Sequence, residues 1–310
     1  MKKTLKTLYN IDTKALIKYT DKVYKIKSDN EEEYCLKYVD CLSNNSLIEK
    51  VNTLKLSDSF VMPIKTCIRT PQGQKNNRLF YVTPWVDDDL IESKDLKVKY
   101  YLLQIGQMHA KTSYTLNVSA SYFHEISMKL EENIEECYQK YESIVYVVER
   151  KEYRSPFEWY FLEHFKDVIA SLDKSRNYLN KFKELVKNKA TLRQVITHQN
   201  FSYDHVFLSK DKIIGNDKMK LNSPIFDIKS LFDVIDFGTI DISGMFDEYS
   251  KNMHLEDYEL YWMLTLLFIV KDLKVTHNDF DNLSQFMHIL FRYKSVCELE
   301  NKLEIKNSTA

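Results

Sequence analysis

The sequence predicts an α+β fold of two unequal lobes, a small strand-rich lobe over residues 1–86 and a large helical lobe over residues 87–310. Three observations support this prediction. Segments that alternate apolar and polar residues precede residue 86, stripes of helical period fill the chain after about residue 95, and Pro84-Trp85 marks the change between them. A chain of 310 residues is long enough for two lobes around a cleft.

Short strands account for the N-terminal lobe. Residues 22–27 alternate apolar and polar side chains, Ser28-Asp29-Asn30 predicts a turn, and residues 33–39 continue as the second strand of a hairpin. A short helix is expected over 47–56, because Leu47, Val51 and Leu54 share one face. Two further strands are expected, one around 61–70 and one over 79–83.

Helices account for the C-terminal lobe. Ser155-Pro156-Phe157-Glu158 predicts a helix start, with a Ser cap, Pro in the first turn and Glu as the reciprocal capping partner. Apolar stripes of helical period predict the remaining helices. Their members are Leu102, Ile105, His109 and Thr112, then Ile126, Leu130, Ile134, Tyr138 and Tyr141, then Tyr258, Trp262, Thr265 and Ile269, and finally Leu283, Phe286 and Leu290.

Composition excludes several classes of protein. A net charge of −1 gives no electrostatic case for nucleic acid or anionic membranes as partners. Five Cys without a C-x-x-C pair fit a reduced compartment and exclude a structural zinc site. The first residues have no apolar segment of a signal peptide. The apolar run 260–270 is too short to span a bilayer and predicts a buried helix, so we expect no transmembrane segment.

The segment 196–207 has the layout of a kinase-type catalytic loop. His198 is followed by a catalytic position two residues later, a metal-ligand position seven residues later and an apolar strand. Aminoglycoside and choline kinases have H-G-D-x-x-x-x-N there, whereas this chain has Asn200 and His205. A neutral amide cannot accept the proton of an attacking hydroxyl, and Mg²⁺ prefers oxygen ligands to imidazole. The layout therefore predicts a kinase-like scaffold without catalytic residues.

A metal-binding Asp is expected about twenty residues after His198, where the chain has Gly215 and Asn216. Asp217 is close enough for a small shift to restore a carboxylate, and it is the only fallback metal ligand. Asp236-Phe237-Gly238 spells a kinase D-F-G motif but lies too far along the chain, so we interpret it as a loop between helices.

Lys37 is the candidate for contact with nucleotide phosphates. It shares a strand face with Cys35 and Val39, and Glu49 is its candidate partner. A strand Lys that faces water is the competing interpretation. A Gly-rich loop is missing between Ile17 and Ile26, so the backbone cannot approach phosphates as closely there.

The chain resembles the CotS-related spore coat proteins, in particular the YsxE group, within the superfamily of aminoglycoside phosphotransferases and choline kinases. The motifs that carry the resemblance are the strand pair 25–37, the hinge Leu79–Trp85, Met108-His109-Ala110-Lys111-Thr112, Tyr153–Glu158 and the loop 196–207. Gln199 departs from the resemblance, because Gly is usual there. The resemblance implies a bilobal protein-kinase-like fold, in which His198 holds the loop and Asp227, in a D-P-x-x-D-L-like segment, braces it.

It also implies a pseudokinase scaffold or interaction module in the mother-cell cytoplasm, on or near the spore coat, with coat or morphogenetic proteins as partners. No cofactor is then expected. Two alternatives stay open, an active ATP-dependent phosphotransferase with an unusual site and a nucleotide-binding switch that transfers nothing. Activity of either kind would require ATP, and transfer would require Mg²⁺.

Overall fold

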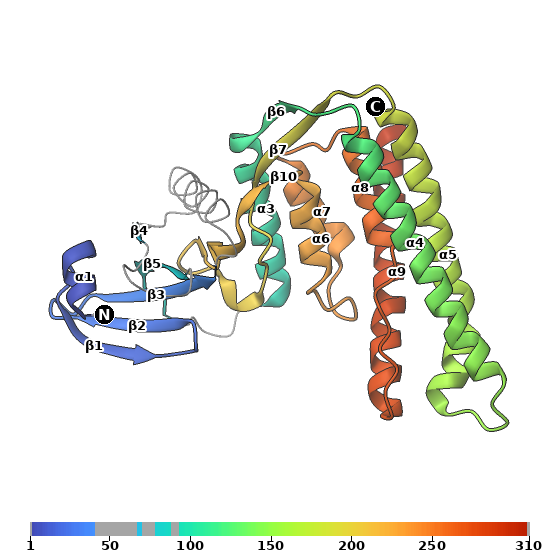
Figure 1. Cartoon of the computed structure of the whole chain (residues 1–310), viewed down its shortest axis with the longest axis horizontal. Helices are drawn as coiled ribbons and strands as arrows, with labels where there is room; N and C mark the ends of the chain where they lie inside the picture. Colours follow the sequence, from blue (N-terminus) through green and yellow to red (C-terminus); the bar gives the residue numbers. More distant parts are fainter. Residues whose placement is uncertain (1, 41–66, 70–77, 88–92, 309–310) are drawn as a thin grey trace.

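The structure, a computed structural model, describes residues 2–40, 67–69, 78–87 and 93–308. It confirms the predicted fold class: a small strand-rich N-terminal region is followed by a large helical region (Figure 1). The expected helix over 47–56 and its Glu49 lie outside the described residues. None of the described helices is long and apolar enough to cross a membrane.

The N-terminal region is an antiparallel sheet in the order β1-β2-β3-β5-β4, next to the short helix α1. Aliphatic and aromatic side chains form its core, including Leu5 from α1 and Leu36 from β3. The sequence analysis did not predict α1 or β1. The bounds are Lys2–Tyr9 for α1, Thr13–Lys18 for β1, Val23–Ser28 for β2, Glu33–Asp40 for β3, Cys67–Arg69 for β4 and Arg78–Pro84 for β5.

Strand β3 lies in the interior of this sheet, and it carries Lys37. Lys37 is opposite Val23 of β2 and Tyr81 of β5. The chain leaves the sheet at Trp85, whose backbone N–H donates to the carbonyl of Glu33 over 2.9 Å. These ladders fix the position of Lys37 relative to Pro84-Trp85.

The C-terminal region consists of helices around a small three-stranded sheet in the order β10-β7-β6. Helices α4, α5 and α9 are long and run side by side, away from the N-terminal sheet (Figure 1). The helix bounds are Lys94–Thr112 for α3, Tyr122–Glu149 for α4, Pro156–Val186 for α5, Ile225–Phe232 for α6, Ile242–Ser250 for α7, Asp257–Phe268 for α8 and Asp279–Ser308 for α9. The remaining elements are β6 (Tyr114–Asn117), β7 (Thr191–Thr197), η1 (Tyr203–His205), β8 (Val206–Phe207), β9 (Lys212–Ile213), η2 (Asn216–Lys218) and β10 (Lys220–Asn222).

The predicted start of α5 is confirmed in detail. Ser155 caps the backbone N–H of Glu158, and the Glu158 carboxylate accepts from the backbone N–H of Ser155 over 2.9 Å. Asp279 at the start of α9 also reaches this end, because it accepts from the Ser155 hydroxyl and from the Phe157 backbone N–H. One cap therefore joins the starts of two long helices.

Close packing of α3 against α7 positions a buried His. A Cβ on Gly106 of α3 would lie 2.9 Å from the carbonyl oxygen of Tyr249, so only glycine fits at this approach. The two helices can then bring His109 of α3 beside Tyr249, whose hydroxyl is 3.0 Å from His109 Nδ1.

Substitution of Trp262 provides a test of the packing of the C-terminal core. Its ring is 3% exposed and packs against Phe182 and Phe226. We expect Trp262→Ala to lower the free energy of unfolding by about 3–5 kcal/mol, because the change leaves a cavity in a packed core. Urea unfolding monitored by circular dichroism measures this. Trp159 is 58% exposed and provides the matched control, and an equal loss in Trp159→Ala would contradict the assignment.

Candidate functional site

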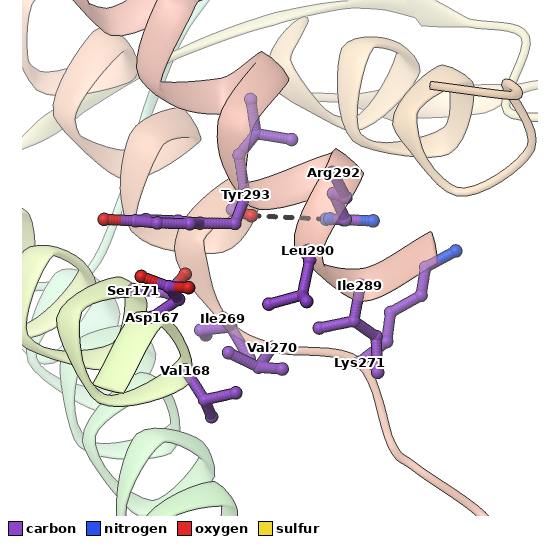
Figure 2. Close-up of a pocket in the computed structure, with 11 residues that line it drawn as sticks. Asp167, Val168, Ser171, Ile269, Val270, Lys271, Ile289, Leu290, Arg292 and Tyr293 are labelled. Atoms are coloured by element: carbon purple, nitrogen blue, oxygen red, sulfur yellow. Dashed lines mark hydrogen bonds between the residues drawn. The ribbon is translucent and has the colours of Figure 1, made fainter. Parts of the chain in front are cut away.

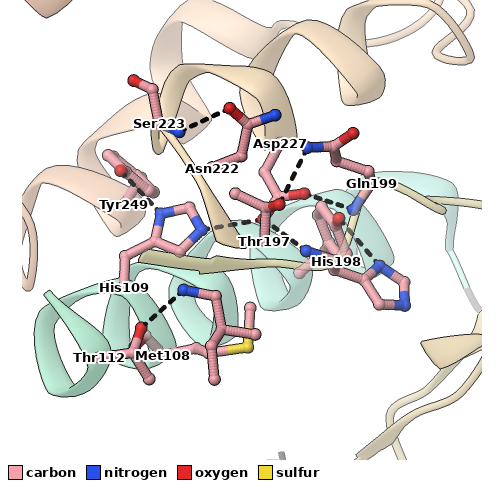
Figure 3. A network of polar contacts seen from close by, with 12 residues as sticks. Met108, His109, Thr112, Thr197, His198, Gln199, Asn222, Ser223, Asp227 and Tyr249 are labelled. Carbon is pink, nitrogen blue, oxygen red and sulfur yellow. Dashed lines mark hydrogen bonds and ion pairs between the residues drawn. The ribbon is translucent and has the colours of Figure 1, made fainter. Parts of the chain in front are cut away.

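A buried carboxylate holds the loop after β7. Asp227, fully buried at the start of α6, accepts from the backbone N–H of His198 over 2.9 Å and from that of Gln199 over 2.5 Å. Its third partner is His109, at 2.8 Å from Nε2 (Figure 3). Because an ionised carboxylate only accepts, His109 donates through Nε2 and accepts from the Tyr249 hydroxyl through Nδ1. Asp227 thus ties α3, α6 and the loop together.

His198 is fully buried and has two partners. Nε2 lies 3.0 Å from the carbonyl of Ile214, which can only accept, so Nε2 carries the proton. Nδ1 then accepts from the Tyr101 hydroxyl at 3.1 Å. Burial lowers the pKa of His198 to about 4, against the opposing effect of the Asp227 charge. His198 is therefore a neutral side chain that fixes the loop to the segment after β9.

Gln199 has φ 49°, in the left-handed region that favours glycine. Its backbone N–H donates to Asp227, and its side-chain amide donates to the Thr197 hydroxyl over 2.9 Å. These bonds oppose the strain of a non-glycine residue at a position where the resemblance leads us to expect Gly.

The positions that the sequence predicts to be degenerate contact one another. The Asn200 amide donates to the carbonyl of Gly215 over 2.6 Å, and Nδ1 of His205 donates to the carbonyl of Asn200 over 2.8 Å. Gly215 has φ 85°, and a Cβ on it would lie 2.8 Å from Asn200 Nδ2 and from His205 Nδ1. The three predicted positions therefore lie together, and Asn200 and His205 fill the space that a side chain at 215 would occupy.

Lys37 and Asp217 are brought together by the fold. Their side chains form an ion pair of 2.5 Å across 180 residues of sequence. The expected partner of Lys37 was Glu49, and Glu49 lies outside the described residues; Asp217 was expected only as a fallback metal ligand. No local pattern could have found this pair, because it joins the N-terminal sheet to the C-terminal region.

These residues do not fit a magnesium ion. Mg²⁺ prefers carboxylate and carbonyl oxygens in octahedral geometry. His205 offers an imidazole that already donates to a carbonyl, Gly215 has no side chain, and the Asp217 carboxylate is paired with Lys37. Within the described ranges, no group of three or more His, Cys, Asp or Glu side chains could hold a metal ion.

A cavity of about 500 Å³ lies between the N-terminal sheet and this loop. Its volume is in the range of sites for small ligands. Lys37 and Cys35 of β3 line it together, as their shared face predicts, and the opposite wall includes His205 and Gly215. This position favours the interpretation in which the Lys37 side chain faces the cleft over the one in which it faces water. Trp85 closes the hinge side, with Lys25 Nζ 4.7 Å from its ring centre.

A second cavity, between α5, α8 and α9, is too small for an organic ligand. It measures about 10 Å³ and lies beside the buried Arg292 (Figure 2). Arg292 donates to Asp233 over 2.9 Å. A space of this size holds at most about one water molecule. The cavity of about 500 Å³ between the N-terminal sheet and the loop is therefore the better candidate for a binding site.

Two other predicted features can be placed. Asp236-Phe237-Gly238 lies between α6 and α7, with Phe237 buried against Phe232, which agrees with the interpretation as a loop between helices. His109 is a site residue that the sequence analysis placed only on a helix face, without its bond to Asp227. Its position in the motif 108–112 was the one available signal.

No model of a known protein family matches the sequence, and no curated protein sequence matches it either. Solved structures do match. An aminoglycoside phosphotransferase from Alicyclobacillus acidocaldarius has 11% identity and a TM-score of 0.65, over 94% of this chain and 93% of that one. The spectinomycin phosphotransferase APH(9)-Ia, in complex with ADP and spectinomycin, has 13% identity and a TM-score of 0.51, over 96% and 97%. At these identities the likeness shows the kinase-like aminoglycoside phosphotransferase fold.

We expect Asp227→Ala to lower the free energy of unfolding by about 3–5 kcal/mol, because it leaves two buried N–H groups and His109 without their acceptor. Denaturant titration measures the loss. Glu163→Ala, an exposed change on α5, is the control and should cost little. Similar stability of the two variants would contradict the role of Asp227.

We expect stability to fall between pH 6.5 and pH 4 because of His198. In that window the unfolded chain binds a proton at His198 that the folded chain does not, since the pKa of His198 is about 4 in the fold. At pH 5 the loss is about 2 kcal/mol.

His198→Gln removes this titration and keeps an N–H for the Ile214 carbonyl, so the pH dependence of its unfolding free energy should be flatter by about one proton. Exposed His124→Gln should keep the slope of the original chain. An unchanged slope in His198→Gln would show that another group causes the loss.

Proposed function

We propose that this protein is a catalytically degenerate kinase-fold protein that acts by binding, as a scaffold or interaction module, and does not transfer phosphate. The contacts among Asn200, His205 and Gly215 carry the proposal. A Cβ at 215 would lie 2.8 Å from Asn200 Nδ2 and from His205 Nδ1, so a carboxylate at this position would require these side chains to move. Phosphoryl transfer depends on positioned charge and a base, and this loop supplies neither.

The proposed setting is the spore coat. The resemblance to the CotS-related proteins supports it, and it implies coat or morphogenetic proteins as partners in the mother-cell cytoplasm. Under this proposal the folded surface carries the function. Asn200→Asp should therefore leave coat assembly unchanged, whereas Trp262→Ala, which destabilises the fold, should prevent it.

A nucleotide-binding switch is the second candidate. The cavity of about 500 Å³ and the position of Lys37 on its wall favour it. The structure of the spectinomycin phosphotransferase contains ADP, and its fold is similar. An active phosphotransferase is disfavoured, because Asp217, the fallback metal ligand, is paired with Lys37.

We expect no phosphoryl transfer from ATP to aminoglycosides, choline or generic protein substrates, with a rate that stays at background when Mg²⁺ is added. Asn200→Asp should also be inactive, because it restores one carboxylate and leaves His205 and Gly215 in place. Release of ADP in a coupled assay measures this, with an active aminoglycoside phosphotransferase as the positive control. A rate above background that disappears in Asn200→Ala or Asp217→Ala would overturn the proposal.

A further inference from the structure

Helix α9 has packed sides and one side that faces solvent. Phe286 packs against the rings of Phe157 and Phe161 in α5, and His288 lies against Phe237 in the loop after α6. These contacts fix α9 against two neighbouring parts of the C-terminal region. The side of the helix between them is covered by no other described element, because its side chains are exposed.

Apolar side chains occupy this exposed side. Phe280 is 76% exposed, Phe291 is 42% exposed, and Met287 is exposed between them. At 3.6 residues per turn the three positions lie within about 40° of one another around the helix axis. Leu283 and Leu290, half-buried towards α5, border them, and we call these five residues the α9 stripe. Single exposed apolar residues are ordinary, whereas a stripe of helical period indicates a surface that packs against another helix.

Charges of opposite sign lie at the two ends of the α9 stripe. The exposed Asp281 follows Phe280 at one end, and the exposed Lys294 lies about one turn beyond Phe291 at the other. Asp281 accepts from the Asn278 amide over 2.8 Å, and neither Asp281 nor Lys294 forms an ion pair with another described residue. Met287 is the centre of this pattern, because it is seven residues from both Phe280 and Lys294.

We propose that the α9 stripe binds the α9 stripe of a second copy of this chain, as an antiparallel pair of helices with Met287 at the two-fold axis. Phe280 of each copy then lies over the apolar stem of Lys294 of the other, and Asp281 comes within reach of the Lys294 ammonium group. A parallel pair would instead place Asp281 beside Asp281 and Lys294 beside Lys294, and these like charges would repel.

This charge pattern favours a second copy over an unrelated helix as the occupant. A two-fold rotation about Met287 exchanges the acidic and the basic end, so the stripe is complementary to itself. Contacts of the same patch on both subunits are the commonest way in which soluble proteins form dimers. Helix α9 also lies away from the N-terminal sheet, so the pairing leaves that sheet uncovered (Figure 1). The inference deepens the proposed function, because it gives the interaction module a first partner.

The first test is analytical ultracentrifugation of the full chain over concentrations of about 1–200 µM. We expect a dimer with a Kd of about 1–100 µM, because one helix face is a small interface. Met287→Glu places two like charges at the axis and should raise this Kd at least about tenfold. Met128→Glu, at an exposed position on α4, is the matched control and should leave the Kd unchanged.

Circular dichroism verifies that both Met variants are folded. A chain that stays monomeric at every concentration would leave the stripe to a different protein and overturn the inference. A dimer whose Kd is the same in Met287→Glu would overturn it as well, because the contact would then lie elsewhere on the molecule.

The second test exchanges the charges at the two ends of the α9 stripe. Asp281→Lys and Lys294→Asp each place like charges opposite one another in the antiparallel pair, so each single variant should raise the Kd at least about threefold. The double variant reverses both charges and should restore the original Kd to within about twofold. A double variant that dimerises no better than the two single variants would refute the antiparallel arrangement.

This inference and the proposed function fail in different ways. A monomer that releases no ADP from ATP would overturn the second copy as the partner and leave the loss of catalysis intact. Release of ADP by a dimer would overturn the proposed function and leave the pairing of α9 intact.

Discussion

The arrangement of the candidate site depends on one buried carboxylate. Asp227 accepts from two consecutive backbone N–H groups of the loop and from His109, so it fixes the loop relative to α3 and α6. Gln199 could not keep its left-handed backbone, nor His198 its bond to Ile214, if the loop were free to turn. A charge buried without water is stable only with such a set of donors, so the loss of one donor destabilises the whole arrangement.

The residues at the predicted catalytic-loop positions also pack within this frame. Asn200, His205 and Gly215 form a closed set of contacts with no room for a larger side chain at 215. This part of the loop is therefore closely packed beside the cavity of about 500 Å³.

Local signals were predictable from the sequence, and distant pairings were not. The strands β2, β3 and β5 and the cap of α5 follow from alternation and from a four-residue motif, so the sequence was sufficient for them. Helix α1 and strand β1 were missed, because neither carries a turn signal or a long periodic pattern. The partner of Lys37 was beyond sequence reasoning, since 180 residues separate it from Asp217 and only the closed fold brings them together. The clustering of Asn200, His205 and Gly215 was foreseeable only through a known loop layout.

The cap shared by α5 and α9 has a consequence for how the chain is made. Ser155 and Asp279 are 124 residues apart, so the first turn of α5 leaves the ribosome long before the carboxylate that completes its cap. Phe157 and Phe161 pack against the ring of Phe286 in α9, which is also synthesised more than a hundred residues later. During synthesis the α4-α5 hairpin therefore presents these apolar side chains to solvent until α9 has been made.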